Sequence, residues 1–209
     1  MKVIFQIALI LSMFHSAIAQ DSEGWVSLFN GKSLKGWEVG VNASSFKVED
    51  GKIVVNGPRA HLFYSGKIEK HDFKNFEFKA QVMTKPGANS GIYFHTEYQE
   101  DGWPNKGFEV QVNNSQSDWK RTGSLYNIQN VKEVYVKDNE WYTESITVRG
   151  NRVIIKINDI VVIDYTEPEN PLRPKEHALR VIDRGTFALQ AHDPNSVVYY
   201  KDIMVKPLP

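Results

Sequence analysis

The sequence predicts an all-β domain built as a two-sheet antiparallel sandwich. Short runs of alternating apolar and polar residues recur along the chain, separated by Gly, Asn, Asp and Pro, which is the pattern of strands joined by turns. No stretch sustains the apolar spacing of a long amphipathic helix. Strands with one apolar face become buried when two sheets pack face to face. The 209 residues suit a single domain of this kind.

The first residues differ in kind from the rest of the chain. A basic start precedes an apolar run over residues 3–14, and Ala17 and Ala19 then place small side chains where a signal peptidase reads. We therefore predict a signal peptide over residues 1–19 and one mature domain over residues 20–209, exported to the periplasm or secreted. The apolar run is short for a membrane span and no later segment is long and apolar enough, so we expect no membrane span.

Turn signals and alternation define the expected strands. Asp50-Gly51 is a hairpin signal between two apolar runs, and Pro86-Gly87 ends the run over residues 75–84. In chain order, the expected strands cover residues 46–48, 52–55, 75–84, 90–98, 107–113, 123–128, 141–149, 152–158, 160–165, 186–192 and 197–205. Residues 167–185 are rich in proline and charge, and we expect them to form the one long irregular loop, of a kind that is often functional or mobile.

Composition excludes several classes of partner and chemistry. Lys plus Arg and Asp plus Glu both number 25, so the chain lacks the basic footprint of nucleic-acid binding, and we expect no nucleic-acid partner. The absence of cysteine excludes disulfides and a lipid anchor at a cleavage-site cysteine. No serine-hydrolase elbow, local zinc motif, P-loop or dinucleotide fingerprint occurs, so we expect no cofactor and no metal. A scattered calcium site and the oligomeric state stay open.

The polar faces of several expected strands carry an unusual set of side chains. An ordinary solvated sheet face favours Lys, Glu and Thr, whereas these faces carry amides, imidazoles, phenols and a carboxylate, which are compact and directional hydrogen-bonding groups. Because strand side chains alternate between faces, the groups expected on the polar faces are Tyr93, His95, Glu109, Gln111, Asn113, Ser124, Tyr126, Gln190 and His192. Sugars present rows of hydroxyls that need such groups, so we predict a carbohydrate-binding face; a merely wet sheet face is the alternative.

Among the titratable groups, Glu109 is the first candidate for acid–base chemistry. It lies in mid-strand between apolar residues, where partial burial raises the pKa of a carboxyl. His192 and His95 are the next candidates on strand parity. His61, His71 and His177 lie outside this pattern, and we expect them on the surface.

The tryptophans divide into two groups. Trp103 and Trp119 lie in expected loops beside the polar strands, where an exposed indole suits the apolar face of a pyranose ring; capping the sandwich edge is the alternative. Trp25, Trp37 and Trp141 follow strand or turn patterns, and we expect them in the core.

A series of motifs in a fixed order gives the chain a family resemblance. From about residue 24 to residue 208 it resembles the 3-keto-disaccharide hydrolase domain family, which has a jelly-roll fold of the concanavalin A-like lectin and glucanase type. The motifs are VSLFNGKSLKGW (26–37), VEDGKIVVNG (48–57), ANSGIYFH (88–95), GFEVQV (107–112), TGSLY (122–126), EWYTESITVRGNRVIIKIND (140–159), FALQAHD (187–193) and VVYYKDIMVKPL (197–208).

The resemblance also implies a set of site residues. The positions that match the family's polar site are Asn89, Ser90, Glu109, Gln111, Tyr126, Gln190 and His192. The paired-carboxylate strand E-x-D-x-x-E of true laminarinases is missing, so a two-carboxylate glycosidase mechanism is not expected. This chain departs from the family with His95 in place of a usual Arg, Tyr142 in place of a usual Asn and Asn158-Asp159 in place of Asn-Gly.

The resemblance implies cleavage of a glycoside already oxidised to a ketone at C3. Such a ketone acidifies the proton on C2, so one base can remove it and the enolate can expel the C1 substituent. Glu109 or His192 is the expected base, and the other, or His95, the donor to the leaving group. The expected binders of substrate are Asn89, Ser90, Tyr93, Trp103, Gln111, Trp119, Tyr126 and Gln190.

Other reactions and roles stay open. Simple hydrolysis at C1 by the same groups is one. A non-catalytic carbohydrate-binding sandwich is the main alternative, and an adhesive or structural sandwich is a third.

Overall fold

The computed structural model describes residues 23–209 of the chain, so the expected signal peptide over residues 1–19 lies outside the described part. The larger of its two sheets contains β1 (Val26–Ser27), β3 (Phe46–Glu49), β4 (Lys52–Val55), β6 (Asn75–Thr84), β9 (Tyr142–Arg149), β10 (Arg152–Ile157), β11 (Ile160–Thr166) and β13 (Val198–Leu208). The smaller sheet contains β2 (Trp37–Val39), β5 (Ala60–Tyr64), β7 (Ser90–Thr96), β8 (Phe108–Val112) and β12 (Thr186–Ala191).

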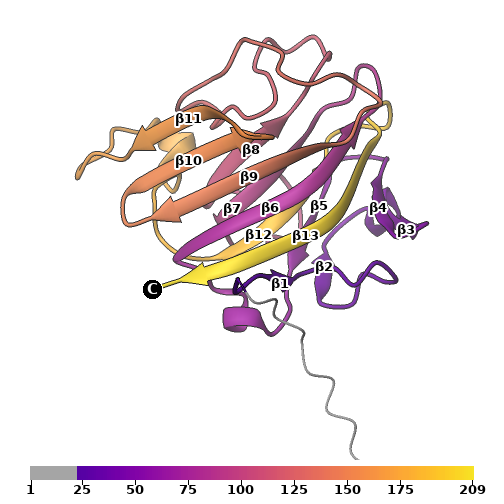
Figure 1. Cartoon of the computed structure of the whole chain (residues 1–209), viewed down its shortest axis with the longest axis horizontal. Helices are drawn as coiled ribbons and strands as arrows, with labels where there is room; N and C mark the ends of the chain where they lie inside the picture. Colours follow the sequence, from indigo (N-terminus) through magenta and orange to yellow (C-terminus); the bar gives the residue numbers. More distant parts are fainter. Residues whose placement is uncertain (1–22) are drawn as a thin grey trace, which may run out of the picture.

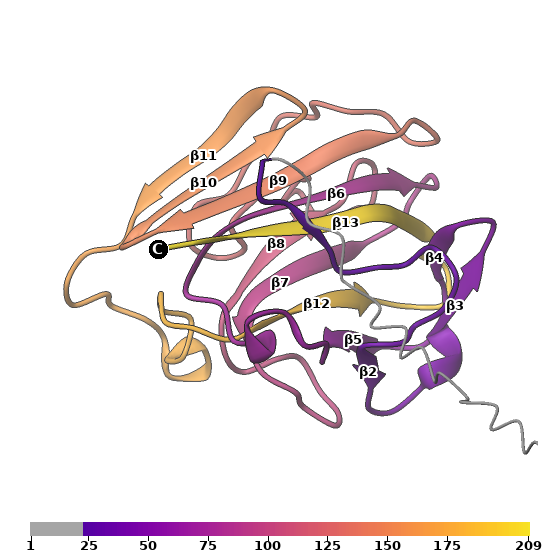
Figure 2. The same cartoon turned by 60° about the horizontal axis from the view of Figure 1, so that its bottom comes forward.

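Both sheets are antiparallel throughout and lie one over the other (Figures 1 and 2). The larger sheet runs in the order β11-β10-β9-β6-β13-β4-β3, with β1 beside β13, and the smaller one in the order β2-β5-β12-β7-β8. Within residues 23–209 the only helical segments are the short turns η1 (Ala43–Ser45), η2 (Ile68–His71) and η3 (Lys175–His177). The expected all-β sandwich is confirmed. None of the described helical turns has the length and apolarity to cross a membrane.

The core forms where the apolar faces of the two sheets meet. Along β6, alternate residues are buried, and the rings of Phe76 and Phe78 pack on the facing sheet. Ring centroids lie 5.9 Å apart for Phe76 and Phe94 and 4.7 Å apart for Phe78 and Phe187. Strand alternation thus places one apolar row of each sheet inside, as the sequence pattern predicts.

Four of the five strands of the smaller sheet are buried on both faces. Every residue of β5, β7, β8 and β12 is buried, so its outer face is covered by chain rather than left open to water. Three irregular segments follow β7, β8 and β11, and they consist of residues 97–107, 113–141 and 167–185. The expectation of a single irregular loop was therefore wrong, and all three of these segments contribute residues to the pocket on that face.

Some strand boundaries and one tryptophan differ from the sequence-based expectation. Residues 123–128 do not form a strand; they run beside β8 and hold it through a bridge between Leu125 and Val110. Strands β2 and β5 were not expected. Trp25 and Trp37 are buried as predicted, but Trp141 is 36% exposed because it precedes β9 and packs under the Lys201 ammonium instead of entering the core.

Candidate active site

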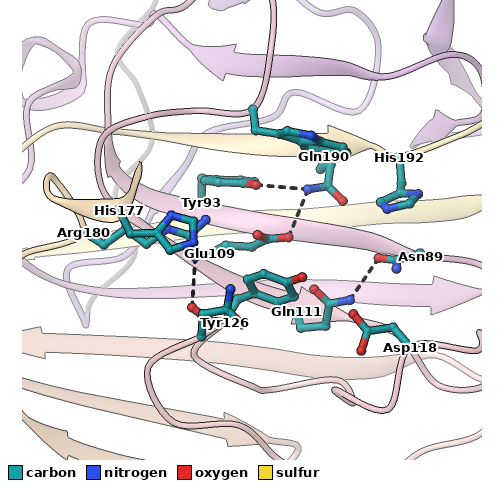
Figure 3. A pocket seen from close by; sticks show the side chains of 12 residues that line it. Asn89, Tyr93, Glu109, Gln111, Asp118, Tyr126, His177, Arg180, Gln190 and His192 are labelled. Atoms are coloured by element: carbon teal, nitrogen blue, oxygen red, sulfur yellow. Dashed lines mark hydrogen bonds between the residues drawn. The ribbon is translucent and has the colours of Figure 1, made fainter. Parts of the chain in front are cut away.

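A pocket of about 330 Å³ lies on the outer face of the smaller sheet (Figure 3). Its lining comes from the β7, β8 and β12 region and from the three covering loops. The lining residues are Asn89, Tyr93, Trp103, Glu109, Gln111, Asp118, Tyr126, Asn127, His177, Arg180, Gln190 and His192.

Strand register explains why polar residues distant in sequence meet here. Tyr93 of β7 pairs with Glu109 of β8, and Gly91 pairs with Gln111. Directly paired residues of antiparallel strands project from the same face. The pocket therefore contains most of the sequence-predicted residues: Asn89, Tyr93, Trp103, Glu109, Gln111, Tyr126, Gln190 and His192.

Glu109 lies at the floor of the pocket and is only 5% exposed. Its Oε1 accepts a hydrogen bond from Nε2 of Gln190 at 3.0 Å, and the same nitrogen donates to the Tyr93 hydroxyl at 3.1 Å. Burial raises the pKa of the Glu109 carboxyl, although the positive charge of Arg180 works against that rise. A carboxyl with a raised pKa and fixed orientation takes up a proton more readily than an exposed one, which suits it to exchange protons with a ligand.

The backbone of β7 leaves room for this carboxylate. A Cβ added at Gly91 would lie 2.7 Å from Oε1 of Glu109, closer than real side chains approach. The glycine of the SGIYF stretch therefore lets the Glu109 side chain lie flat across the neighbouring strand. This is a site requirement that strand alternation alone does not reveal.

His192 belongs to a hydrogen-bonded pair at the opposite side of the pocket. Its Nδ1 lies 2.8 Å from Oδ2 of Asp193, and that oxygen also accepts the Ser196 hydroxyl at 2.8 Å. Partial burial raises the pKa of Asp193, but its hydrogen bonds outweigh burial and hold that pKa below the ordinary value. A charged Asp193 holds the proton on Nδ1 of His192, so Nε2 is the ring nitrogen left to exchange a proton with a ligand.

The pocket also holds amides with unused hydrogen-bonding capacity. Nε2 of Gln111 donates to Oδ1 of Asn89 at 3.0 Å. Within residues 23–209, the amide oxygens of Gln111 and Gln190 are buried and have no hydrogen-bond partner. Because buried acceptors are seldom left unsatisfied, these oxygens are sites for the hydroxyl groups of a ligand or for water.

The loop over residues 167–185 supplies a cation. Nη1 of Arg180 donates to the Tyr126 carbonyl at 3.0 Å, which holds the guanidinium at the edge of the pocket. The loop is fixed by a buried ion pair between Arg173 and Glu167 at 2.8 Å, and Glu167 also accepts the Ile182 amide at 2.7 Å. These contacts hold the loop beside the pocket, to which it contributes His177 and Arg180.

Three histidines do not lie where the sequence pattern placed them. His95 has φ 54° at a bulge in β7 where the register with β12 shifts, so it leaves the polar face. Its Nε2 lies 2.8 Å from the Lys74 carbonyl, and its Nδ1 accepts the Asp183 amide at 3.2 Å. Burial lowers the pKa of His95 to about 4. His95 is thus a buried structural residue outside the pocket. His61 is buried, so the surface expectation was wrong for it. His177 is only partly buried, but it lines the pocket, where the strand pattern did not place it.

Two expected binding residues also lie elsewhere. Ser90 is on the core side of β7, where its hydroxyl donates to the Gln190 carbonyl and contacts the Tyr200 hydroxyl at 2.8 Å. Trp119 is 48% exposed beside Arg121 and Lys132, away from the main pocket. Strand alternation did not predict the pocket residues Asp118, Asn127 and Arg180, because loop residues carry no periodic signal. The proline-rich and charged composition of residues 167–185 was the one sequence feature that pointed to this loop.

Asp118 is the second carboxylate of the pocket, and it is already engaged by its own loop. Its Oδ1 accepts the Lys120 amide at 3.0 Å, and its Oδ2 lies 3.5 Å from the Lys120 ammonium. Residues 23–209 contain no cluster of three or more His, Cys, Asp or Glu side chains arranged to hold a metal ion.

Comparison with known proteins gives the family. A family model described as a 3-keto-α-glucoside-1,2-lyase-like domain matches residues 24–206. The chain belongs to this family. The resemblance stated from sequence motifs is therefore confirmed, and the chain is a carbohydrate-active domain by family.

The name of a curated relative also refers to a 3-keto sugar. The 3-keto-disaccharide hydrolase of Bacteroides thetaiotaomicron is 28% identical over an alignment of 176 residues, with a coverage of 69% of this chain and 59% of the relative. The chain thus spans about three fifths of the length of the curated relative that it matches.

Solved structures share the fold. A candidate glycosyl hydrolase from Parabacteroides distasonis superposes with a TM-score of 0.75 at 23% identity, over 90% of this chain and 95% of that one. A carbohydrate-binding module from Bacillus subtilis gives 0.59 at 15% identity, over 82% and 95%. A non-specific endo-β-glucanase gives 0.56 at 12% identity, over 90% and 92%. At these identities the likeness shows the concanavalin A-like jelly roll alone.

Proposed function

We propose that the chain cleaves glycosides whose sugar ring carries a ketone at C3, by removing the C2 proton and releasing the C1 substituent. The observation that carries this proposal is the pairing, in one pocket, of a buried carboxyl with raised pKa and a carboxylate-held imidazole. The family match and the name of the Bacteroides relative support the substrate class. The substrate itself is part of the proposal.

The reaction needs one base, one acid and stabilisation of an oxyanion. When a base takes the C2 proton, the electron pair forms a C2–C3 enolate with its charge on the C3 oxygen. The pair then moves into a C1–C2 double bond as the ketone re-forms, the C1–O bond breaks and the leaving oxygen takes a proton. Addition of water across C1 and C2 completes a net hydrolysis.

The pocket residues fit these roles in a specific way. Glu109 is the proposed base, because its charged form is destabilised by burial and regains a proton readily. His192, oriented by Asp193, is the proposed donor to the leaving oxygen. The Arg180 guanidinium, whose charge acts on Glu109, is the proposed counter-charge for the enolate.

The amides hold the rest of the ring in this proposal. Three amide side chains line the pocket beside Glu109, those of Asn89, Gln111 and Gln190. The amide oxygens of Gln111 and Gln190 can each accept a hydrogen bond from the ligand. Sugar hydroxyls are both donors and acceptors, so they match this set. We further propose that the protein acts outside the cytoplasm, in keeping with the signal-peptide pattern of residues 1–19.

A direct assay tests the reaction. The mature protein is incubated with methyl 3-keto-glucoside and, separately, with an unoxidised disaccharide, and products are followed by mass spectrometry. We expect product from the keto-glycoside alone, and a loss of roughly 10²- to 10⁴-fold in Glu109→Gln with an unchanged thermal unfolding curve. Undiminished turnover by the folded variant removes Glu109 from the mechanism. Binding without product by the wild type supports the alternative of a carbohydrate-binding module.

A further inference from the structure

Trp103 closes the pocket on the side of β5. Its ring lies 5.4 Å from the ring of His192 and 5.7 Å from that of His61, in an edge-on arrangement with the latter. The guanidinium of Arg59 lies over the same indole at 5.4 Å. The indole therefore separates the pocket from two nitrogen-rich side chains of the smaller sheet and the segment that leads into it.

Those two side chains have unused hydrogen-bonding atoms. Within residues 23–209, Nε2 of His61 and Nε of Arg59 are both buried and lack a hydrogen-bond partner. An unsatisfied buried polar atom costs about 1–3 kcal/mol, and such atoms in folded proteins call for a specific explanation. Burial, followed by the charges of Arg59 and His192, lowers the pKa of His61 to about 3, so its ring is neutral and keeps one lone pair.

Strand register makes His61 a continuation of the site. His61 of β5 pairs directly with Gln190 of β12, which itself holds Glu109. Paired residues share a sheet face, so the polar row that begins on β8 extends to β5. The open pocket includes Gln190 but stops before His61, because Trp103 covers the last position.

We propose that Trp103 sets the length of the sugar chain that the pocket accepts: its indole occupies the position of a further sugar residue, which His61 and Arg59 would otherwise hydrogen-bond. This inference rests on the proposed function, since it concerns the same pocket. An indole and a pyranose have similar footprints, and a pyranose has an apolar face as well. A sugar residue in place of the indole would cover His61 and would also satisfy the two free nitrogens.

The backbone before Trp103 is held in place by contacts that do not involve the indole. Asp101 is tied to Arg59 at 3.0 Å, and the Glu100 carbonyl accepts the Val41 amide at 2.9 Å. The Glu100 carbonyl also lies where a Cβ on Gly40 would be, which shows how closely this part of the loop is docked. The indole itself is 42% exposed. Removing it should open the position over β5 without releasing the loop.

Sugar binding by calorimetry tests the proposal. The ligands are methyl glucoside and two linear glucose trisaccharides, one α-linked and one β-linked. The proteins are wild type, Trp103→Ala, Trp103→Ala with His61→Ala, and Trp141→Ala, which removes a comparably exposed tryptophan from the other sheet. The quantity compared is the ratio of the two Kd values, methyl glucoside over trisaccharide, in each protein.

In Trp103→Ala we expect this ratio to rise about tenfold for at least one trisaccharide, the gain of one or two hydrogen bonds. His61→Ala in that background should abolish the gain, and Trp141→Ala should match the wild type. An unchanged ratio, an equal loss for both ligands, or a gain that survives without His61 overturns the proposal. The calorimetry uses unoxidised sugars, which the proposed reaction does not cleave. A changed ratio together with absent turnover of 3-keto-glycosides would therefore refute the reaction and leave this proposal standing.

Discussion

Glu144 is a carboxyl group inside the sandwich core. It lies on the inner face of β9 between Tyr142 and Ile146 and is fully buried. Neither of its carboxylate oxygens has a hydrogen-bond partner within residues 23–209. Burial raises the pKa of Glu144 well above the ordinary value of 4.5. At pH values between the unfolded and the folded pKa of this group, the folded protein therefore keeps a proton that the unfolded chain releases.

This difference makes stability depend on pH in a definite direction. Because the folded-state pKa is raised, the free energy of unfolding falls as pH rises from about 4.5 toward that folded-state pKa. The contribution of this one group changes by up to about 1.4 kcal/mol for each pH unit in that window. Glu144→Gln has nearly the same shape and cannot ionise, so it should remove this component of the pH dependence.

The size of the effect at neutral pH follows from the unpartnered oxygens. Glu144→Leu removes both oxygens, and each unsatisfied buried group costs about 1–3 kcal/mol of folding free energy. The different shape of leucine causes packing strain in the core, which offsets part of this gain. We expect a net stabilisation of about 2 kcal/mol at pH 7. At roughly 2–4 °C per kcal/mol for a chain of this size, Tm should rise by about 4–8 °C.

Urea unfolding at pH 5 and pH 8 measures both effects. The difference between Glu144→Gln and wild type should grow with pH, and Glu144→Leu should exceed wild type at both values. A difference that stays constant between the two pH values, or a leucine variant that is less stable than wild type, would refute the reasoning. The latter result would mean that Glu144 is satisfied by internal water.

Three further changes test the pocket and its support. Gly91→Ala should lower kcat/KM by roughly 10²-fold with little change in stability, because the new Cβ displaces the Glu109 carboxylate; full activity in steady-state assays would show that Glu109 need not lie there. Asp193→Asn should lower kcat by at least about 10²-fold with KM nearly constant, since the imidazole loses its charged partner; an unaltered pH–rate profile would count against it. Arg173→Met should cost about 3 kcal/mol in urea unfolding, because the buried Glu167 carboxylate loses its cation; a loss under 1 kcal/mol would show that the ion pair does not fix the loop.

Alternation along single strands was sufficient to predict the floor of the pocket. Glu109 and Gln111 lie two residues apart between buried apolar residues, so one face of β8 had to carry both. The same rule places Gln190 and His192 together. The pairing of β8 with β7, and of β7 with β12, then brings these groups into one pocket without any feature beyond antiparallel register.

Alternation failed where the backbone departs from the regular pleat. The bulge in β7 turns the His95 side chain away from the polar face, and no residue type in the local sequence predicts a bulge there. His61 was missed because β5 is buried on both faces, so its AHLFY run has no polar alternation to mark it as a strand.

The loop residues of the pocket are determined by distant contacts. Contacts among Glu167, Arg173 and Ile182 fix the loop that contains Arg180. Arg180 itself is held at the pocket by the hydrogen bond that its guanidinium donates to the Tyr126 carbonyl. Ile182 lies 15 residues from Glu167, and Arg180 lies 54 residues from Tyr126, so neither contact follows a periodic spacing within a strand. They could be found only once the two sheets had been placed, which is why the sequence predicted the loop's composition and not its residues at the site.

Deuterium incorporation at C2 is the most direct test of the proposed reaction. Methyl 3-keto-glucoside is converted in D₂O by wild type and by Glu109→Gln, and the product is examined by NMR. The account predicts deuterium at C2 of the wild-type product and neither exchange nor product with the variant. A wild-type product that retains its original hydrogen at C2 would contradict proton abstraction and would indicate direct displacement at C1.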